Sequence, residues 1–296
     1  IVLSATLWAE LPEKKGLDVI NRANAEAYIG FLASDALEGR EAGFRGGRIA
    51  GEYIVSNLKT MGIEPLFESY YQPFEAYNKE RQKKGRFQVH PDSIAKLKQG
   101  VHQKLSMNNI LGKIEGKNPN EYVIIGAHYD HLGFDPMLDG DRVYNGADDN
   151  ASGVSAVLQV AKAFLATGVQ PERTVIFAFW DGEEKGLLGS KYFVQTFSEM
   201  DKVKGYLNYD MIGRNKDESK PMHVVYFYTE AHPVFGDWLK NDIKKYGLNL
   251  TPDYRPWDKP VGGSDNASFA LLDIPVIWYH TDGHPDYHMP SCLLYT

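Results

Sequence analysis

Four apolar segments of this sequence run directly into histidine or acidic residues. The clusters that follow them are His128-Tyr129-Asp130-His131, Asp181-Gly182-Glu183-Glu184, Asp210, and His280 with Asp286 and His288 close behind. Imidazole nitrogens and carboxylate oxygens are the atoms with which proteins hold catalytic zinc, usually leaving one position for water. One such cluster would be unremarkable on a protein surface. Four clusters at corresponding positions predict a metal centre.

A fifth segment, Gly146-Ala147-Asp148-Asp149-Asn150-Ala151-Ser152-Gly153, places two aspartates beside a glycine turn just before a predicted helix. Asp149 or Asn150 could cap that helix through its side-chain oxygen. Capping explains one polar residue but leaves an aspartate without a role. Two metal ions about 3.5–4 Å apart can share one bridging carboxylate, so the segment fits a two-metal site.

The clusters must be positioned by a sheet, because each follows an apolar run typical of a buried strand. Strands are predicted at 109–114, 122–127, 174–180, 205–209, 223–228 and 275–279, and helices at 151–166, 187–197 and 233–246, after a mainly helical region at 21–60. This alternation predicts an α/β fold with a largely parallel sheet covered by helices on both faces. In such sheets the carboxyl ends of the strands line one crevice, which would bring the clusters together.

Five of these motifs, in this order, resemble those of the two-zinc exopeptidases. The segments are Gly126–His131, Gly146–Gly153, Asp181–Ser190, Asn208–Met211 and Asp286–His288. The sequence resembles the bacterial leucyl-aminopeptidase-like enzymes, which are related to glutamate carboxypeptidase II and glutaminyl cyclase. The resemblance covers about residues 105–291, and residues 20–65 resemble the amino-terminal helices of the family. It implies a three-layer α/β/α fold with a mostly parallel mixed central sheet.

The resemblance also implies a role for each motif residue. Asp148 would bridge two zinc ions, His128 and Asp210 would complete the ligands of one ion, and Glu184 and His288 would complete those of the other. Glu183 would be the general base, and Asp130 would orient His128 through its second ring nitrogen. Ser264-Asp265 resembles a further family motif near the site.

The implied function is that of a zinc-dependent aminopeptidase acting on peptides with a free amino terminus. Zinc lowers the pKa of bound water to about 7, so a hydroxide bridging the metals could attack the peptide bond, with Glu183 moving the proton. Two alternatives are a glutaminyl cyclase, which works with one zinc, and a non-catalytic binding domain of the same fold. The intact Asp148-Asp149-Asn150 and Gly186–Ser190 segments favour the peptidase.

Two positions depart from the family pattern. Some relatives carry a tyrosine three residues before the Ser-Asp pair, where this sequence has Val261. After the last histidine the family usually reads Pro-Ser-Asp and continues into a long helix. This sequence reads Pro290-Ser291-Cys292 and stops at Thr296, so a missing carboxy-terminal helix is expected.

The 296 residues are predicted to form a single domain, residues 1–296, with a polar and aromatic surface excursion at about 68–104. The net charge of −7 argues against nucleic-acid partners. No apolar run reaches the roughly 20 residues that span a membrane. The apolar segment Ile1–Ala9 could be the tail of a signal peptide or a short buried strand or helix end. The single Cys292 fits a reducing compartment and also an exported protein without a disulfide, and export is the expected localisation. The sequence indicates no oligomeric state.

Overall fold

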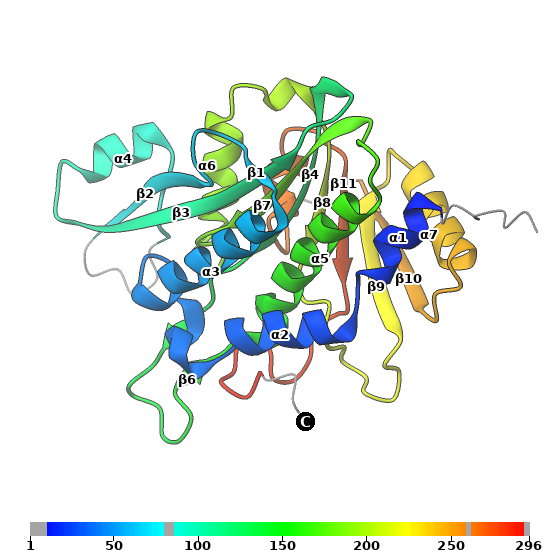
Figure 1. The fold of residues 1–296 in the computed structure, drawn as a ribbon. Coiled ribbons are helices and arrows are strands. Elements are labelled where there is room, and N and C mark those ends of the chain that lie inside the picture. Colours follow the sequence, from blue (N-terminus) through cyan, green and yellow to red (C-terminus); the bar gives the residue numbers. More distant parts are fainter. Residues whose placement is uncertain (1–10, 80–85, 259–261, 293–296) are drawn as a thin grey trace, which may run out of the picture.

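The computed structural model describes residues 11–79, 86–258 and 262–292 (Figure 1). The amino-terminal part contains the helices α1 (Pro12–Asp18), α2 (Arg22–Leu32) and α3 (Arg45–Met61), then β1 (Glu64–Pro65), β2 (Tyr71–Lys79), α4 (Pro91–Leu97) and β3 (His102–Ile114). The central part contains β4 (Asn118–His128), β5 (Gly133–Phe134), β6 (Val143–Tyr144), α5 (Gly153–Ala166), β7 (Arg173–Trp180), α6 (Leu188–Thr196) and β8 (Val203–Tyr209). It is followed by β9 (His223–Thr229), α7 (Val234–Lys245), β10 (Thr251–Trp257), α8 (Asn266–Ala270) and β11 (Val276–His280).

One large sheet organises the described residues, in the order β1-β3-β7-β4-β8-β11-β9-β10, with β2 paired to β3. The four central strands β7, β4, β8 and β11 are parallel neighbours. β3 joins this centre antiparallel to β7, and β9 joins it antiparallel to β11. The predicted α/β fold with a mostly parallel, mixed central sheet is therefore confirmed.

Strand β7 shows how the sheet supports helices on both faces. Side chains alternate along a strand, and Val175, Phe177 and Phe179 pack into one core while Ile176, Ala178 and Trp180 pack into another. The first core contains residues of α2, α3 and α5, which cover one face in Figure 1, and the second contains residues of α6 and α8. Burial on both faces explains why the strand is a continuous apolar run rather than an alternating one.

Two parts of the predicted surface excursion at 68–104 belong to the sheet, namely β2 and the first residues of β3. β2 pairs with β3 from Tyr71 to Lys79, and Phe74 and Ala76 are buried in a small core with Met107 of β3. Several polar residues of β2 and β3 lie on the face of this strand pair that is exposed to solvent. The sequence also gave no prediction for β10, where two prolines argue against a strand; β10 pairs on one side only, with β9, as expected for a strand containing proline.

No helix in the described part of the chain is long and apolar enough to cross a membrane. The apolar segment Ile1–Ala9 and the position of Val261 lie outside the described residues.

Candidate metal centre

The parallel strands β7, β4, β8 and β11 all end on the same side of the sheet. The acidic and histidine clusters come directly after these carboxyl ends. His128 is the last residue of β4, and Asp210 comes directly after β8. Glu183 and Glu184 follow β7 after a turn at Gly182, whose φ of 76° suits glycine. The sheet therefore brings together residues that are far apart in the sequence.

The two aspartates lie in the irregular turn at 147–152, ahead of α5. Gly146 begins this turn at φ 57°, and a Cβ there would lie 2.2 Å from the Asp149 carbonyl oxygen and 2.5 Å from the His131 ring. Only glycine fits this position. The Asp149–Asn150 peptide bond is cis. Asn150 satisfies the first amide of α5, because its Oδ1 accepts a hydrogen bond of 2.9 Å from the Gly153 amide.

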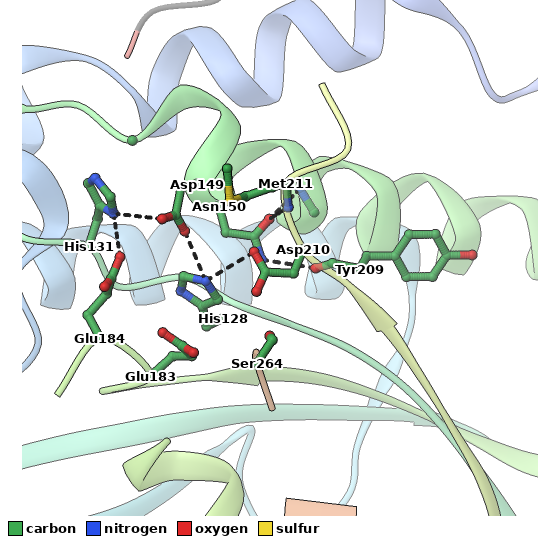
Figure 2. A network of polar contacts seen from close by, with 12 residues as sticks. His128, His131, Asp149, Asn150, Glu183, Glu184, Tyr209, Asp210, Met211 and Ser264 are labelled. Carbon is green, nitrogen blue, oxygen red and sulfur yellow. Dashed lines mark hydrogen bonds and ion pairs between the residues drawn. The ribbon is translucent and has the colours of Figure 1, made fainter. Parts of the chain in front are cut away.

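Asp149 lies between two sets of potential metal ligands (Figure 2). Its Oδ1 is 3.1 Å from Nε2 of His128, and its Oδ2 is 3.2 Å from Nε2 of His288. We call His128, Asp149 and Asp210 the strand-end group, and Asp149, Glu184, His131 and His288 the loop group. Within each of the sets His128–Asp149–Asp210 and His131–Asp149–Glu184, one ligand atom per residue lies within 4.8 Å of the others.

Asp148, the residue expected to bridge the metals, is directed elsewhere. Its Oδ2 is 3.2 Å from Nε2 of His284, and its Oδ1 accepts a 2.7 Å hydrogen bond from the Gly213 amide. The geometry thus places Asp149, one residue later, in the shared position. Two consecutive aspartates in a tight turn point in different directions, and their identity alone does not say which one faces the crevice.

The loop group brings together Glu184 and His288, as expected, and adds His131. Glu184 Oε2 lies 3.2 Å from Nε2 of His288, and Glu184 Oε1 lies 2.8 Å from Nδ1 of His131. His131 is fully buried, and its Nε2 has no hydrogen-bond partner among the described residues. The sequence analysis assigned no role to His131, although its place three residues after His128 in the same cluster was a usable signal.

Asp130 and Glu183 occupy positions around His128. Nδ1 of His128 lies 3.2 Å from the backbone oxygen of Asp130 and 3.7 Å from its Oδ1, which also accepts a 3.0 Å hydrogen bond from the Glu183 amide. The contact between His128 and the Asp130 carboxylate is thus too long for a direct hydrogen bond. The Glu183 carboxylate has no hydrogen bond or ion pair with the described residues and faces the centre in Figure 2.

The protonation equilibria of these residues are strongly perturbed. Burial, reinforced by the nearby Glu184 charge and opposed by His128, raises the pKa of Glu183 well above its ordinary range. Burial disfavours the ionised form of Asp149, but hydrogen bonds from His128 and His288 outweigh it and lower the Asp149 pKa well below its usual value. Burial likewise opposes the charge on His128, yet Asp210 and Glu183 raise its pKa well above normal.

These residues fit bound cations. Carboxylates crowd one buried site, and ligand atoms such as Asp210 Oδ1 and His131 Nε2 are buried without a hydrogen-bond partner among the described residues. Buried polar atoms normally find a partner, and buried charges are usually paired or bound to metal. The oxygen and imidazole donors suit zinc.

Arg40 is a buried residue to which the sequence analysis assigned no role, and it lies in the segment between α2 and α3. Its guanidinium donates to backbone oxygens around the centre, among them Tyr129 at 2.9 Å, Asn145 at 2.5 Å and Gly146 at 2.9 Å. It thus ties the loop after β4 to the turn that carries Asp149. Burial outweighs the nearby acidic groups and lowers the pKa of Arg40 to about 10.

The Ser264-Asp265 pair also lies near the centre. The Ser264 hydroxyl accepts a 2.9 Å hydrogen bond from Asn208 on β8. Asp265 is fully buried, and burial raises its pKa to about 7. Ser264 thus contacts β8, and neither residue of the pair belongs to the strand-end group or the loop group.

Comparison with known proteins places this geometry among peptidases. Residues 109–291 match the model of peptidase family M28. The chain is 34% identical over 170 residues to leupeptin-inactivating enzyme 1 of Streptomyces exfoliatus, an alignment that covers 57% of this chain and 34% of that enzyme. The chain therefore spans about a third of the length of this curated relative.

Solved structures show the same fold. BSAP, a zinc aminopeptidase from Bacillus subtilis, superposes with a TM-score of 0.68 at 17% identity, covering 92% of this chain and 89% of that one. A glutaminyl cyclase from Porphyromonas gingivalis superposes with a TM-score of 0.61 at 16% identity, covering 94% and 91%. The family match includes every expected ligand position, so the resemblance found in the sequence is confirmed: this chain belongs to peptidase family M28.

Proposed function

We propose that the chain is a zinc-dependent aminopeptidase that hydrolyses the first peptide bond of substrates with a free amino terminus. The observation that carries the proposal is the position of Asp149 between the strand-end group and the loop group. A carboxylate shared by two sets of ligands suits two metal ions. The relationship to aminopeptidases supports the same reading, since BSAP is a zinc aminopeptidase of the same fold.

The proposed ligands are His128 and Asp210 for one zinc, Glu184 and His288 for the other, and Asp149 for both. His131 is the additional imidazole beside Glu184. When bound, the zinc ions supply a Lewis acid that polarises the scissile carbonyl and makes hydroxide available near neutral pH. The first expectation, in which Asp148 bridged the ions, is replaced here by Asp149.

We assign Glu183 as the general base. Its carboxylate faces the centre and makes no hydrogen bond or ion pair with the described residues, whereas the adjacent Glu184 is paired with two histidines. A base with a raised pKa can both accept a proton from water and return it to the leaving amine near neutral pH. Asp130 positions the Glu183 backbone through its 3.0 Å hydrogen bond and lies beside His128.

The substrate's amine has a suitable environment. Asp149, Glu183 and Asp210 line a cavity of about 180 Å³ together with Met211, Trp278 and Tyr287. A cavity of this size and charge suits a terminal ammonium group with one side chain. This supports cleavage from the amino end.

Metal analysis combined with substrate hydrolysis tests the proposal. The purified protein is expected to hold two zinc ions per chain and to release nitroaniline from Leu- or Ala-nitroanilide in a chelator-sensitive reaction. Blocking the amino terminus by acetylation should abolish hydrolysis. A protein that cyclises amino-terminal glutamine but leaves these nitroanilides intact is a glutaminyl cyclase. One that binds peptides without turning them over is a binding domain.

Export from the cytoplasm is a separate part of the proposal. It is supported by the apolar character of the segment Ile1–Ala9. Fractionation of cells that produce the natural protein, with a cytoplasmic marker as control, tests it. Recovery only with the marker would contradict export.

A further inference from the structure

Two cavities meet at Glu183. The smaller one, about 180 Å³, extends over His128 and Asp210, and the larger one, about 680 Å³, extends over Lys185 and Lys191. Glu183 lines both. A peptide bond held against this residue would therefore place the groups on its two sides in different cavities.

The sizes of the cavities fix the direction of the substrate. An aminopeptidase holds one residue on the amino side of the scissile bond and a chain of variable length on the other. The smaller cavity has room for one residue, so the leaving group lies in the larger one. Substrate preference beyond the first residue is then decided by the walls of the larger cavity.

Basic residues dominate the charged wall of the larger cavity beyond the metal ligands. Lys185 is neutralised, because its Nζ lies 2.8 Å from Oε1 of Glu41. Lys191 on α6 donates to the backbone oxygen of Gly186, at 2.9 Å, and has no ion-pair partner within the described part of the chain. The guanidinium of Arg86 has no ion-pair partner among the described residues. Two cationic side chains thus line this cavity without a carboxylate partner in residues 11–79, 86–258 and 262–292.

Lys191 and Arg86 also influence one another. Burial and then the charge of Arg86 lower the pKa of Lys191, while Asp265 and Glu183 act in the opposite direction. Two like charges close enough to repel are stabilised by an anion placed between them, and charge-assisted hydrogen bonds to carboxylates are among the strongest in proteins. The smaller cavity has the opposite character, since its charged groups are mainly acidic.

We propose that Lys191 and Arg86 form a carboxylate-binding site on the leaving-group side of the scissile bond. The favoured substrates are peptides with an anionic group just after the first residue, supplied by an acidic second side chain or by the terminal carboxylate of a dipeptide. This inference rests on the proposed aminopeptidase function. It makes Lys191 and Arg86 specificity-determining residues.

Matched pairs of peptides test the proposal and separate the two sources of the carboxylate. Leu-Glu-amide is compared with Leu-Gln-amide for the side chain, and Leu-Ala with Leu-Ala-amide for the chain end. The kcat/KM of the carboxylate member should exceed that of its partner by about tenfold in at least one pair. The preference should shrink as ionic strength rises.

Substitutions then assign the preference to the site. Lys191→Met and Arg86→Gln should each bring the ratio of the two kcat/KM values within a pair close to one. The change should come mainly from a higher KM for the peptide with the carboxylate. Lys162→Met is the matched control, because Lys162 is a half-buried lysine of α5, on the opposite face of the sheet. This control should keep the ratio of the unmodified protein.

Each outcome is decisive. Equal hydrolysis within both pairs by a protein that cleaves Leu-nitroanilide leaves the proposed function standing and overturns the carboxylate site. A preference that survives both substitutions also overturns it. A protein that hydrolyses none of these substrates overturns the proposed function and this inference together.

Discussion

The strand-end group and the loop group share Asp149 but are built differently. His128 is the last residue of a central strand, and its side chain is 1% exposed. His288 lies in a loop at φ 57°, and its side chain is 35% exposed. Residues on strands are held more precisely than residues on loops. The same centre therefore contains a rigid half and a half that depends on a distant segment.

Polar contacts compensate for the looser backbone around His288. Asp286 forms an ion pair with Arg214 and accepts a 2.7 Å hydrogen bond from the Ser291 hydroxyl. Asp148 reaches the same segment through His284, at 3.2 Å. The two consecutive aspartates thus serve different halves: Asp149 is shared by the two groups of ligands, and Asp148 supports the loop that carries His288.

The largest difference is expected between substitutions of these two aspartates. Asp149→Asn should remove both zinc ions and all measurable turnover, because it weakens the ligand common to both groups. Asp148→Asn should keep the strand-end zinc and weaken the other by about 10- to 100-fold, as for residues that hold ligands in place. Zinc titration of both variants measures this. Loss of both ions from Asp148→Asn alone would restore Asp148 as the bridging residue.

Glu183→Gln tests whether the protein can hold its zinc ions and still lack peptidase activity. Removing the base while keeping a side chain of equal size should lower kcat by about 10²- to 10⁴-fold. Zinc content should stay at the level of the unmodified protein. Glu184→Gln is the matched comparison, and it should lose zinc from the loop group. The reverse result would exchange the roles of these two neighbours.

The halves should also differ in the order of metal loss. Under a graded chelator, the zinc of the loop group should leave first, because His288 is partly exposed and held by a loop. Cobalt substitution with spectroscopic titration would resolve the two steps. Arg214→Gln should widen the gap between them by releasing Asp286, whereas Arg45→Gln, at an exposed ion pair with Glu38, should not. Simultaneous loss of both ions would contradict the comparison.

The smallest expected effect concerns Asp181, which directly follows β7. Asp181 is buried near Asp130, and burial and then that neighbour raise its pKa to about 7. Its folded-state pKa exceeds the unfolded value, so its contribution to stability is present below about pH 4 and is lost as pH rises to about 7. The slope is at most about 1.4 kcal/mol per pH unit.

Asp181→Asn removes this titration. The variant should become more stable relative to the unmodified metal-free protein as pH rises from 5 to 8, measured by urea unfolding. Its amide oxygen can still accept from Tyr129, which donates to Asp181 Oδ2 at 3.0 Å. Parallel stability curves for the two proteins would show that Asp181 does not titrate in this range.

The sequence alone predicted the fold class, because the features that define it are local. Apolar runs such as 174–180 indicate buried strands, and the three- to four-residue spacing in 151–166 indicates a helix. β7 and α5 match these predictions within two residues. The edge of the sheet was harder to predict, since β2 is half-exposed and β10 contains prolines, so neither carries the pattern of a central strand.

The sequence also predicted most of the site residues, because the clusters follow strands whose carboxyl ends lie on the same side of a parallel sheet. It assigned the shared position to Asp148, whereas the structure directs Asp149 there, and it offered no role for Arg40 or His131. Those assignments depend on side-chain direction within a turn and on contacts between residues far apart in the chain. Arg40 lies 105 positions from Asn145, whose oxygen it holds. Composition and periodicity record neither direction nor such distant pairing, so only the packed tertiary structure determines them.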